Sequence, residues 1–326
     1  MNKSQTKEKI LGFYNKYGMV VILIGLLIVC SSISPVFVSQ ANIVNLLSQI
    51  AVVTILTCGI TLLIIAGQTD LSGGSIIALT GCMCVGTFKS LVEGGMGDGL
   101  AGIISIGVAI GVGMFANALS GIVVAKFRAP AFIVTLAMMQ AGRGVCYIYT
   151  NGAPIYKIGN IVRLGQGRIQ GLLPYSVIAM VICIIATGFI LKKMRLGRHI
   201  YAIGGNQEAA IASGISREWT IIKAYLIHGV FVGIAGVFFM TRLNSGQPAE
   251  AIGLEFDAIT AAIIGGASLS GGVGGIYGSV IGSIIIGVIT NILTLRSVQS
   301  YYQMIITGVI IVFAVILDIV TKGKKD

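Results

Sequence analysis

The chain has 326 residues, of which 56% are hydrophobic and 10% are charged. Because a soluble domain carries about 25% charged residues, this composition excludes an ordinary soluble globule and predicts a surface that faces lipid. The formal net charge of +11 would suit nucleic-acid binding, but the basic residues cluster at the chain ends and in two connections, as in membrane proteins. We therefore expect membrane lipid as the surroundings and no nucleic acid as a partner.

Ten apolar stretches follow in chain order, most of them close to the roughly 20 residues that a spanning helix needs. They cover residues 18–34, 43–66, 75–92, 100–125, 130–150, 173–191, 222–241, 256–269, 276–294 and 301–320. The eighth is short and is either one short helix or two broken halves. Because unpaired strand edges cannot lie in lipid, we predict an all-α polytopic membrane protein with about ten transmembrane helices.

The basic residues predict the orientation of the chain. With ten spans, one side receives fifteen of them: Lys3, Lys7, Lys9, Lys16, Lys126, Arg128, Lys192, Lys193, Arg195, Arg198, Arg217, Lys223, Lys322, Lys324 and Lys325. The other side receives Lys157, Arg163, Arg168, Arg242 and Arg296, with Lys89 near it. Since basic residues concentrate on the cytoplasmic side, we expect both termini in the cytoplasm.

Two connections are long enough to have functions of their own. Residues 151–174 form an outer loop, which offers a polar surface for a docking protein. Residues 192–223 form a cytoplasmic segment that contains its own helix signals. The whole chain, residues 1–326, is expected to be a single transmembrane domain that carries these two segments.

The run GGNQEAAIASG in the cytoplasmic segment predicts a helix of about two turns outside the bilayer. Gly204 and Gly205 allow a turn, Asn206 is a plausible N-cap, and Gly214 is a plausible helix stop. Glu208 lies in the first turn, where the helix dipole favours an anion. The next two residues, alanines, are small enough for the close approach of a partner protein.

The sequence QTDLSGGS raises the question of what Asp70 does beside two apolar helices. Asp70 and Ser72 precede the third helix, and either side chain can cap it at the cytoplasmic end of the bundle. Alternatively, Asp70 is a polar position in a pathway, because ionisable groups at membrane depth usually face a cavity. The capping interpretation predicts that Asp70→Asn is mild, since asparagine also caps helices.

Other polar residues lie within the apolar stretches. Asn45 and Gln49 share one helical face and suit either a solute or a neighbouring helix. Arg143 is expected to pair with another part of the chain or to line a pathway, and His228 to be a hydrogen-bonded packing residue. The six cysteines form no zinc-type cluster and are expected to be small buried hydrophobic residues, so we predict no metal site and no cofactor.

Glu208, Ala209, Ala210 and Gly214 form a Glu-Ala-Ala-x3-Gly pattern that resembles the cytoplasmic signature of permease subunits in bacterial ATP-binding-cassette importers. The runs TDLSGGSIIALTG, VCYIYTNGAP, RLGRHIYAIGGN, LEFDAI and SYYQMI resemble, in this order, the ribose-type sugar permeases of those importers. The resemblance covers nearly the whole chain. Two departures are a glycine at position 73, where the family often has valine, and the lack of a Leu-Pro pair after the Glu-Ala-Ala run.

The resemblance implies a permease in the inner membrane of a bacterium, with several partners. Two permease copies, or two related chains, would form the pathway, a separate ATPase would dock on the segment 192–223, and an extracytoplasmic sugar-binding protein would deliver the solute. The sequence has no GxxxxGK[ST] loop, so we expect it to bind no ATP and not to be an enzyme. Ribose is the first substrate to consider, followed by other pentoses, hexoses and polyols.

Three other functions remain open. A related permease would carry branched-chain amino acids or nucleosides. An ion-coupled secondary transporter would place ionisable groups at the membrane midplane, and the apolar stretches hold few carboxylates. An intramembrane enzyme would need converging catalytic or metal-binding residues, and the two histidines are far apart in the sequence.

Overall fold

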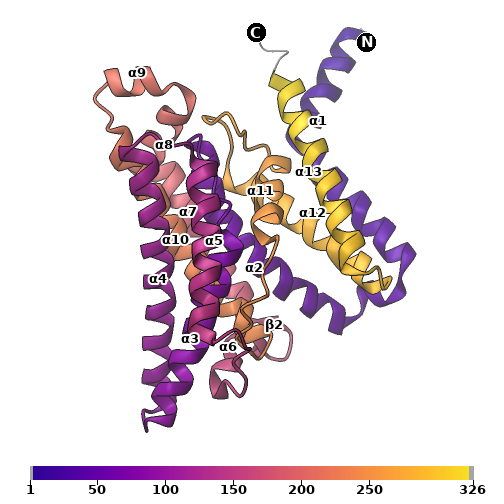
Figure 1. Ribbon diagram of the computed structural model, residues 1–326. Helices are drawn as coiled ribbons and strands as arrows, with labels where there is room; N and C mark the ends of the chain where they lie inside the picture. Colours follow the sequence, from indigo (N-terminus) through magenta and orange to yellow (C-terminus); the bar gives the residue numbers. More distant parts are fainter. Residues whose placement is uncertain (1–2, 323–326) are drawn as a thin grey trace.

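The computed structural model describes residues 3–322, and the side chains of residues 18–316 and 318. It confirms the all-α fold class (Figure 1). The α-helices are α1 Lys3–Ile33, α2 Gln40–Ile65, α3 Gly73–Glu93, α4 Asp98–Lys126, α5 Ala131–Thr150, α6 Val162–Gln166, α7 Tyr175–Lys193, α8 Arg195–Gly205, α9 Gln207–Ala212, α10 Arg217–Arg242, α11 Leu254–Ile264, α12 Ile276–Leu295 and α13 Ser300–Lys322. Two 3₁₀ turns, η1 Pro35–Val38 and η2 Gly159–Ile161, and an antiparallel pair of two-residue strands, β1 Arg168–Ile169 and β2 Leu173–Pro174, complete the described elements.

Seven of the described helices are long and apolar enough to cross a membrane: α2, α3, α4, α5, α7, α10 and α12. Shorter apolar helices cover Gly18–Ile33 of α1 and Ser300–Ile316 of α13. For the eighth stretch, 256–269, the structure favours the broken alternative over one continuous helix. There α11 has 11 residues and is about 16 Å long, roughly half the hydrocarbon thickness. Irregular chain precedes and follows this half-length helix, so the eighth crossing is a broken one.

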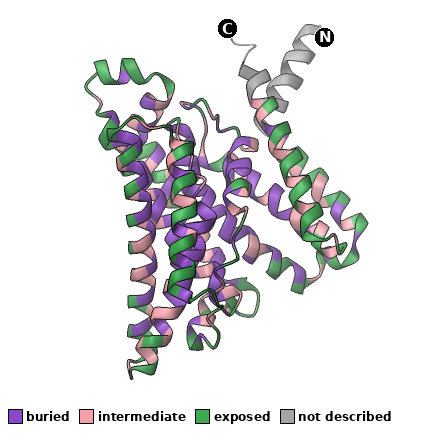
Figure 2. Ribbon diagram, in the orientation of Figure 1, coloured by how far each residue is buried: buried purple, intermediate pink, exposed green. Residues whose placement is uncertain are grey.

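Helix α2 is the centre of the bundle, with 94% of its apolar window buried inside the chain (Figure 2). Hydrogen bonds join it to α12 near both ends. Asn42 and Asn291 exchange two amide hydrogen bonds of 3.0 and 2.9 Å. Farther along, the hydroxyl of Thr61 donates to that of Ser279 over 2.9 Å. Such bonds hold two helices together where lipid offers no hydrophobic driving force between them.

Glycines bring α10 into backbone contact with α3 and α4. A Cβ on Gly229 or Gly233 would collide with the backbone of α4, and a Cβ on Gly236 would collide with that of α3. On the facing helices, a Cβ on Gly113 or Gly81 would collide with α10. Small residues allow this close approach of helices in membranes. The high glycine content therefore serves helix packing in this part of the bundle.

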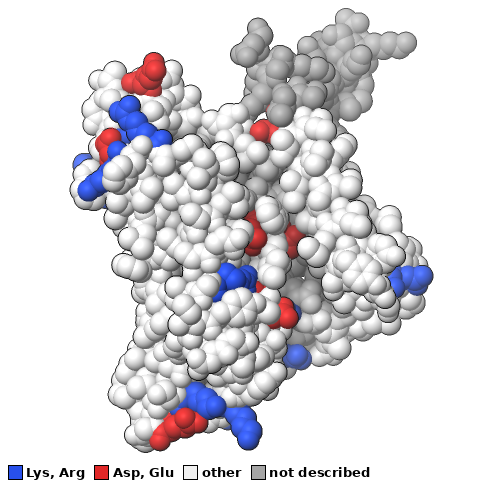
Figure 3. Space-filling model, viewed as in Figure 1, with Lys and Arg blue, Asp and Glu red and all other residues white. Residues whose placement is uncertain are grey.

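The start of α1, the end of α13 and the helices α8 and α9 lie at the same end of the molecule, the top in Figure 1. This arrangement fits an even number of crossings if the broken segment around α11 counts as one. Figure 3 shows that charged atoms gather mainly at the two ends, with a small group halfway between them. The side chains of Lys3, Lys7, Lys9, Lys16, Lys322, Lys324 and Lys325 lie outside the described side chains.

Candidate functional site

Two cavities concern the site, and the larger of them, with a volume of about 560 Å³, lies between α2, α10, α11 and α12. Four of its polar lining residues come from these four helices: Gln49, Arg242, Asp257 and Thr290. Phe239 and neighbouring valines contribute apolar wall. A cavity of this size, with mixed polar and apolar lining, is typical of a small-molecule site.

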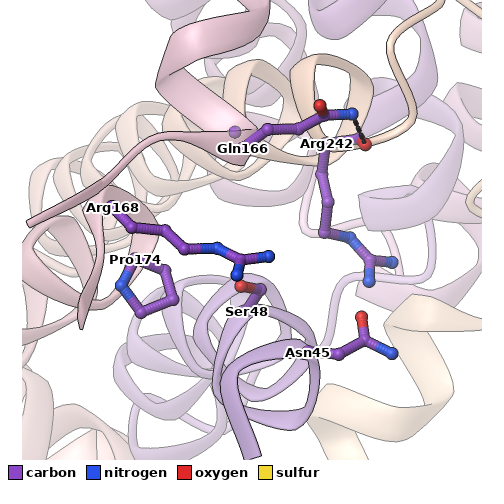
Figure 4. Close-up of a pocket in the computed structure, with 7 residues that line it drawn as sticks. Asn45, Ser48, Gln166, Arg168, Pro174 and Arg242 are labelled. Carbon is purple, nitrogen blue, oxygen red and sulfur yellow. Dashed lines mark hydrogen bonds between the residues drawn. The ribbon is translucent and has the colours of Figure 1, made fainter. Parts of the chain in front are cut away.

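The smaller cavity, of about 260 Å³, lies where α6 and the β1–β2 hairpin cover the ends of α2 and α10 (Figure 4). Asn45, Ser48, Arg168 and Arg242 line it. The side chain of Gln166 donates a hydrogen bond of 3.0 Å to the carbonyl oxygen of Arg242 and so holds α6 on the end of α10. Arg242 lines both cavities, so this residue lies between them.

The structure places Asn45 at the smaller cavity and Gln49 at the larger one. In the described part of the chain, no hydrogen bond joins either side chain to a neighbouring helix. The asparagine that does pair helices, Asn42, lies one turn earlier on α2. A role for Asn45 and Gln49 in a solute pathway stays a prediction that now has a geometric basis.

Asp70 lies inside the bundle and lines neither cavity. Its side chain is fully buried, with one carboxylate oxygen 2.7 Å from Nε2 of His228, midway along α10. Its other oxygen accepts hydrogen bonds from the backbone N–H of Ser72, at 2.8 Å, and from the Ser72 hydroxyl, at 2.6 Å. The chain turns at Gly67, just after α2, and re-enters the bundle. Asp70 was expected at the cytoplasmic end of the bundle, but it lies buried inside it.

Ser72 is the N-cap residue of α3, but its side chain makes no capping hydrogen bond. Its hydroxyl donates to Asp70 instead, so the prediction that Ser72 caps the helix with its side chain is wrong. The expectation for His228, a hydrogen-bonded packing residue, is confirmed. The Nδ1 atom of His228 lies against Gly59 and has no hydrogen-bond partner among the described residues.

Arg143 pairs with the main chain beside the larger cavity. It donates hydrogen bonds to the carbonyl oxygens of Pro248 and Glu250, at 2.5 and 2.8 Å. The pairing interpretation is therefore the one that the geometry favours. Arg143 attaches α5 to the irregular segment that leads to α11.

Two carboxylates that the sequence analysis did not consider lie on α11. Glu255 is 4% exposed, and its Oε2 atom has no hydrogen-bond partner among the described residues. Asp257 lines the larger cavity. They were missed because Glu255 lies just before the expected apolar stretch 256–269 and Asp257 at its start, although the run LEFDAI has acidic residues at two of its six positions. The scarcity of carboxylates in the apolar stretches therefore argues less strongly against an ion-coupled secondary transporter.

The predicted short helix is α9, and both of its ends are as expected. Asn206 is the N-cap, with its side-chain oxygen accepting a 2.9 Å hydrogen bond from the N–H of Ala209. At the other end Gly214 has φ +81°, in the left-handed region. The N–H groups of Gly214 and Ile215 donate to the carbonyl oxygens of Ile211 and Ala210, which is the Schellman pattern of a helix stop.

Two expectations around α9 are wrong. Gly204 and Gly205 do not form a turn but end a separate helix, α8, which the sequence analysis missed. A Cβ on Gly204 would collide with the carbonyl oxygen of Ile65, so this glycine permits contact between α8 and the end of α2. Ala210 is 5% exposed and packs within the chain, so it is not free for a partner. Glu208 and Ala209 are exposed as expected.

All six cysteines are buried free thiols, so the expectation of small buried hydrophobic residues is confirmed. In residues 18–316 and at 318, no three histidine, cysteine, aspartate or glutamate side chains form a group that could hold a metal ion.

Comparison with known proteins places the chain in a family. Residues 42–315 match the family described as "Branched-chain amino acid transport system / permease component". The chain belongs to this permease family. Its curated relatives include the ribose import permease protein RbsC of Escherichia coli K12, which is 38% identical over 91% of each chain. RbsC of Bacillus subtilis 168 is 36% identical over 96% of this chain and 97% of that protein.

A third relative of the permease is the L-arabinose transport system permease protein AraH of E. coli K12. It is 34% identical over 94% of this chain and 90% of that protein. No solved structure matches the permease with significant similarity. The full-length matches and the apolar helices agree on a multi-pass membrane permease, which is a transport component rather than an enzyme.

Proposed function

We propose that this chain is the membrane-spanning permease subunit of an ATP-driven importer for ribose or a related monosaccharide. The observation that carries the proposal is the near full-length similarity to ribose import permeases, supported by that to an L-arabinose permease. The larger cavity, between α2, α10, α11 and α12, has polar and apolar walls that suit a small solute.

The proposal includes three kinds of partner. A separate ATPase docks on α8 and α9, which project from one end of the bundle and include the exposed Glu208 and Ala209. An extracytoplasmic sugar-binding protein delivers the solute at the opposite end, near α6 and the β1–β2 hairpin. A second copy of the chain, or a related permease, completes the pathway. The importer lies in the inner membrane of a bacterium, with both termini of this chain in the cytoplasm.

Uptake of labelled sugar tests this function. The chain, its cognate ATPase and its cognate binding protein are produced together in a strain that lacks its own ribose permease. We expect uptake of labelled ribose that is lost when the chain is omitted or when the phosphate-loop lysine of the ATPase is replaced. Competition by unlabelled L-arabinose, galactose, leucine and uridine then identifies the substrate class.

Two results would contradict the proposal. Uptake of leucine or uridine in place of sugars would assign the chain to the amino-acid or nucleoside branch of its family. Uptake that survives the ATPase replacement and collapses with an ionophore would identify an ion-coupled carrier. The ionophore measurement is needed because Glu255 and Asp257 place carboxylates inside the bundle.

A further inference from the structure

Polar side chains on the larger cavity have no partners of their own. Gln49, Arg242, Asp257 and Thr290 approach it from four different helices. Within the described part of the chain, no hydrogen bond or ion pair joins any of these four side chains to another residue. The Nε atom of Arg242 is buried without a partner. Because unpaired polar groups are costly at membrane depth, these side chains are available to a ligand.

The charges on this cavity select the kind of ligand. Arg242 is a cationic donor and Asp257 an anionic acceptor, yet no ion pair joins them. A second carboxylate, that of Glu250, also lines the cavity. An anionic solute would be repelled by the two carboxylates, and a cationic solute by the guanidinium. A neutral solute with several hydroxyl groups can donate to Asp257 and accept from Arg242 at the same time.

The remaining wall suits a sugar ring. Phe239, Val52 and Val53 give the cavity apolar wall beside its polar donors and acceptors. A monosaccharide presents C–H groups on its faces and hydroxyl groups on its edges, so it can contact both kinds of lining. The volume of about 560 Å³ exceeds what a single monosaccharide needs and leaves room for water.

We propose that Gln49, Arg242, Asp257 and Thr290 form a monosaccharide-binding site within the permease itself. The inference rests on the proposed function and adds a recognition step to it, in which the permease binds the sugar after the binding protein releases it. Arg242 also borders the smaller cavity, into which its guanidinium and that of Arg168 are directed (Figure 4). A sugar that passes between the two cavities therefore meets Arg242 in both.

Sugar uptake and ATP hydrolysis, measured together, test the site. The complete importer is reconstituted in vesicles with sugar-loaded binding protein, and Asp257→Asn and Gln49→Leu are compared with the unaltered chain. We expect the ribose transported per ATP hydrolysed to fall roughly tenfold or more, as for a lost hydrogen bond to a charged group. Stimulation of the ATPase should persist, because the cavity is remote from α8 and α9. Asp257→Asn keeps the size and shape of the side chain and so preserves the packing around the cavity.

Thr54→Val is the matched control. Thr54 is fully buried on α2, lines neither cavity, and its hydroxyl has no hydrogen-bond partner among the described residues. The amount of ribose that Thr54→Val transports per ATP hydrolysed should equal that of the unaltered chain. Equal ratios in Asp257→Asn, Gln49→Leu and the unaltered chain would overturn the site while leaving the importer function intact. Failure of the unaltered importer to carry ribose or any other monosaccharide would instead overturn the proposed function.

A second measurement detects occupancy directly and does not depend on transport by the variants. Thr290→Cys is introduced into a chain whose six native cysteines, all buried, are replaced, and the assembled importer is labelled with a small maleimide. Ribose should slow the labelling at least severalfold, and Asp257→Asn should remove this protection. If ribose gives no protection, the site does not bind sugar. Protection by leucine alone would assign the site to a zwitterion, whose two charges also complement Asp257 and Arg242.

Discussion

The carboxylate of Asp70 is held from two sides inside the bundle. Ser72 donates two hydrogen bonds to one of its oxygens, and His228 lies 2.7 Å from the other. Because His228 belongs to α10 and Asp70 precedes α3, this pair fixes the start of α3 against α10. If Asp70 only capped α3, asparagine could replace it. The hydrogen bond between the buried carboxylate and the buried imidazole of His228 is weakened when the carboxylate becomes an amide. The expectation of a mild Asp70→Asn variant therefore needs revision.

We predict that Asp70→Asn and His228→Asn each lower the free energy of unfolding by about 1–3 kcal/mol, because each leaves a buried polar group without its partner. The measurement is the apparent melting temperature of the detergent-solubilised chain, converted to free energy. The loss of unfolding free energy in the double variant should be smaller than the sum of the losses in the two single variants, by more than roughly 0.5 kcal/mol.

His228→Gln provides the control for this pair. Its amide can reach the position of Nε2 and should recover most of the stability that His228→Asn loses. Strictly additive effects of Asp70→Asn and His228→Asn would show that the two side chains do not interact in the membrane.

Asp70, Asn45 and Gln49 were identifiable from the sequence because each is polar within an apolar context. Their partners were not, since the contact between Asp70 and His228 joins residues 158 positions apart. Arg242 was visible only as one basic residue on the outer side, and nothing local in the sequence places its guanidinium at the junction of two cavities.

At the scale of elements, the interactions at its two ends stabilise α9 more than its own helical hydrogen bonds do. It has six residues, and an isolated helix so short does not form, because nucleation is costly. The Asn206 cap and the positive φ of Gly214 therefore stabilise the two ends of α9. A hydrogen bond also connects α9 to α10, because Nε of Arg217 donates to the side-chain oxygen of Gln207 over 2.8 Å. Nη1 of Arg217 also donates to the carbonyl oxygen of Ala125, at the end of α4.

We predict that Asn206→Ala and Gly214→Val leave the permease in the membrane but separate ATP hydrolysis from sugar uptake. Loss of the cap costs about 1 kcal/mol, and a β-branched residue resists the positive φ of Gly214. ATPase activity stimulated by loaded binding protein is measured beside uptake in reconstituted vesicles. Uptake should fall further than ATPase activity.

Ser213→Ala is the control for α9, because its exposed hydroxyl donates only to the carbonyl oxygen of Ala209 within the same helix. Normal coupling in Asn206→Ala and Gly214→Val would show that α9 does not transmit energy between the subunits. Ala210→Trp is not informative here, since Ala210 is buried within the chain and its enlargement would disturb the permease itself.

The caps of α9 were predictable because capping depends on local residue types. The short helix α8 was missed because its final pair, Gly204 and Gly205, is also the pattern of a turn. Only the long-range approach of Gly204 to Ile65 explains why two glycines end a helix here. Likewise, hydropathy detects the apolar character of α11 but not the point at which a helix stops halfway through the bilayer.

At the scale of the whole molecule, the order of long apolar helices was predictable, because each is a continuous run of about the required length. The broken crossing around α11 preserves the even count on which the orientation depends. The tips of the β1–β2 hairpin and of α9 lie at opposite ends of the bundle in Figure 1 and make the orientation testable.

We predict that the hairpin is outside the cell and α9 inside. Leu172→Cys, at an exposed site in the hairpin, and Ala212→Cys, exposed on α9, are made in a chain without native cysteines. An impermeant maleimide should label Leu172→Cys in intact cells and label Ala212→Cys only after the membrane is opened. The reverse pattern would invert the topology, and labelling of both in intact cells would mean that α7, the candidate span between the two positions, does not cross the membrane. Gly167 is unsuitable for this purpose, because a Cβ there would collide with Tyr175.

The glycine contacts among α3, α4 and α10 limit how the permease can move. Where main chain lies directly on main chain, as between Gly113 and Gly229, no side-chain rotamer can change to let one helix slide past the other. These three helices should therefore travel as one rigid body during a transport cycle. The opening and closing of the route must then occur where this body meets α11 and α12, and that boundary is where the larger cavity lies. A cross-link within the glycine-packed body would leave the cycle running, whereas one across the boundary would arrest it.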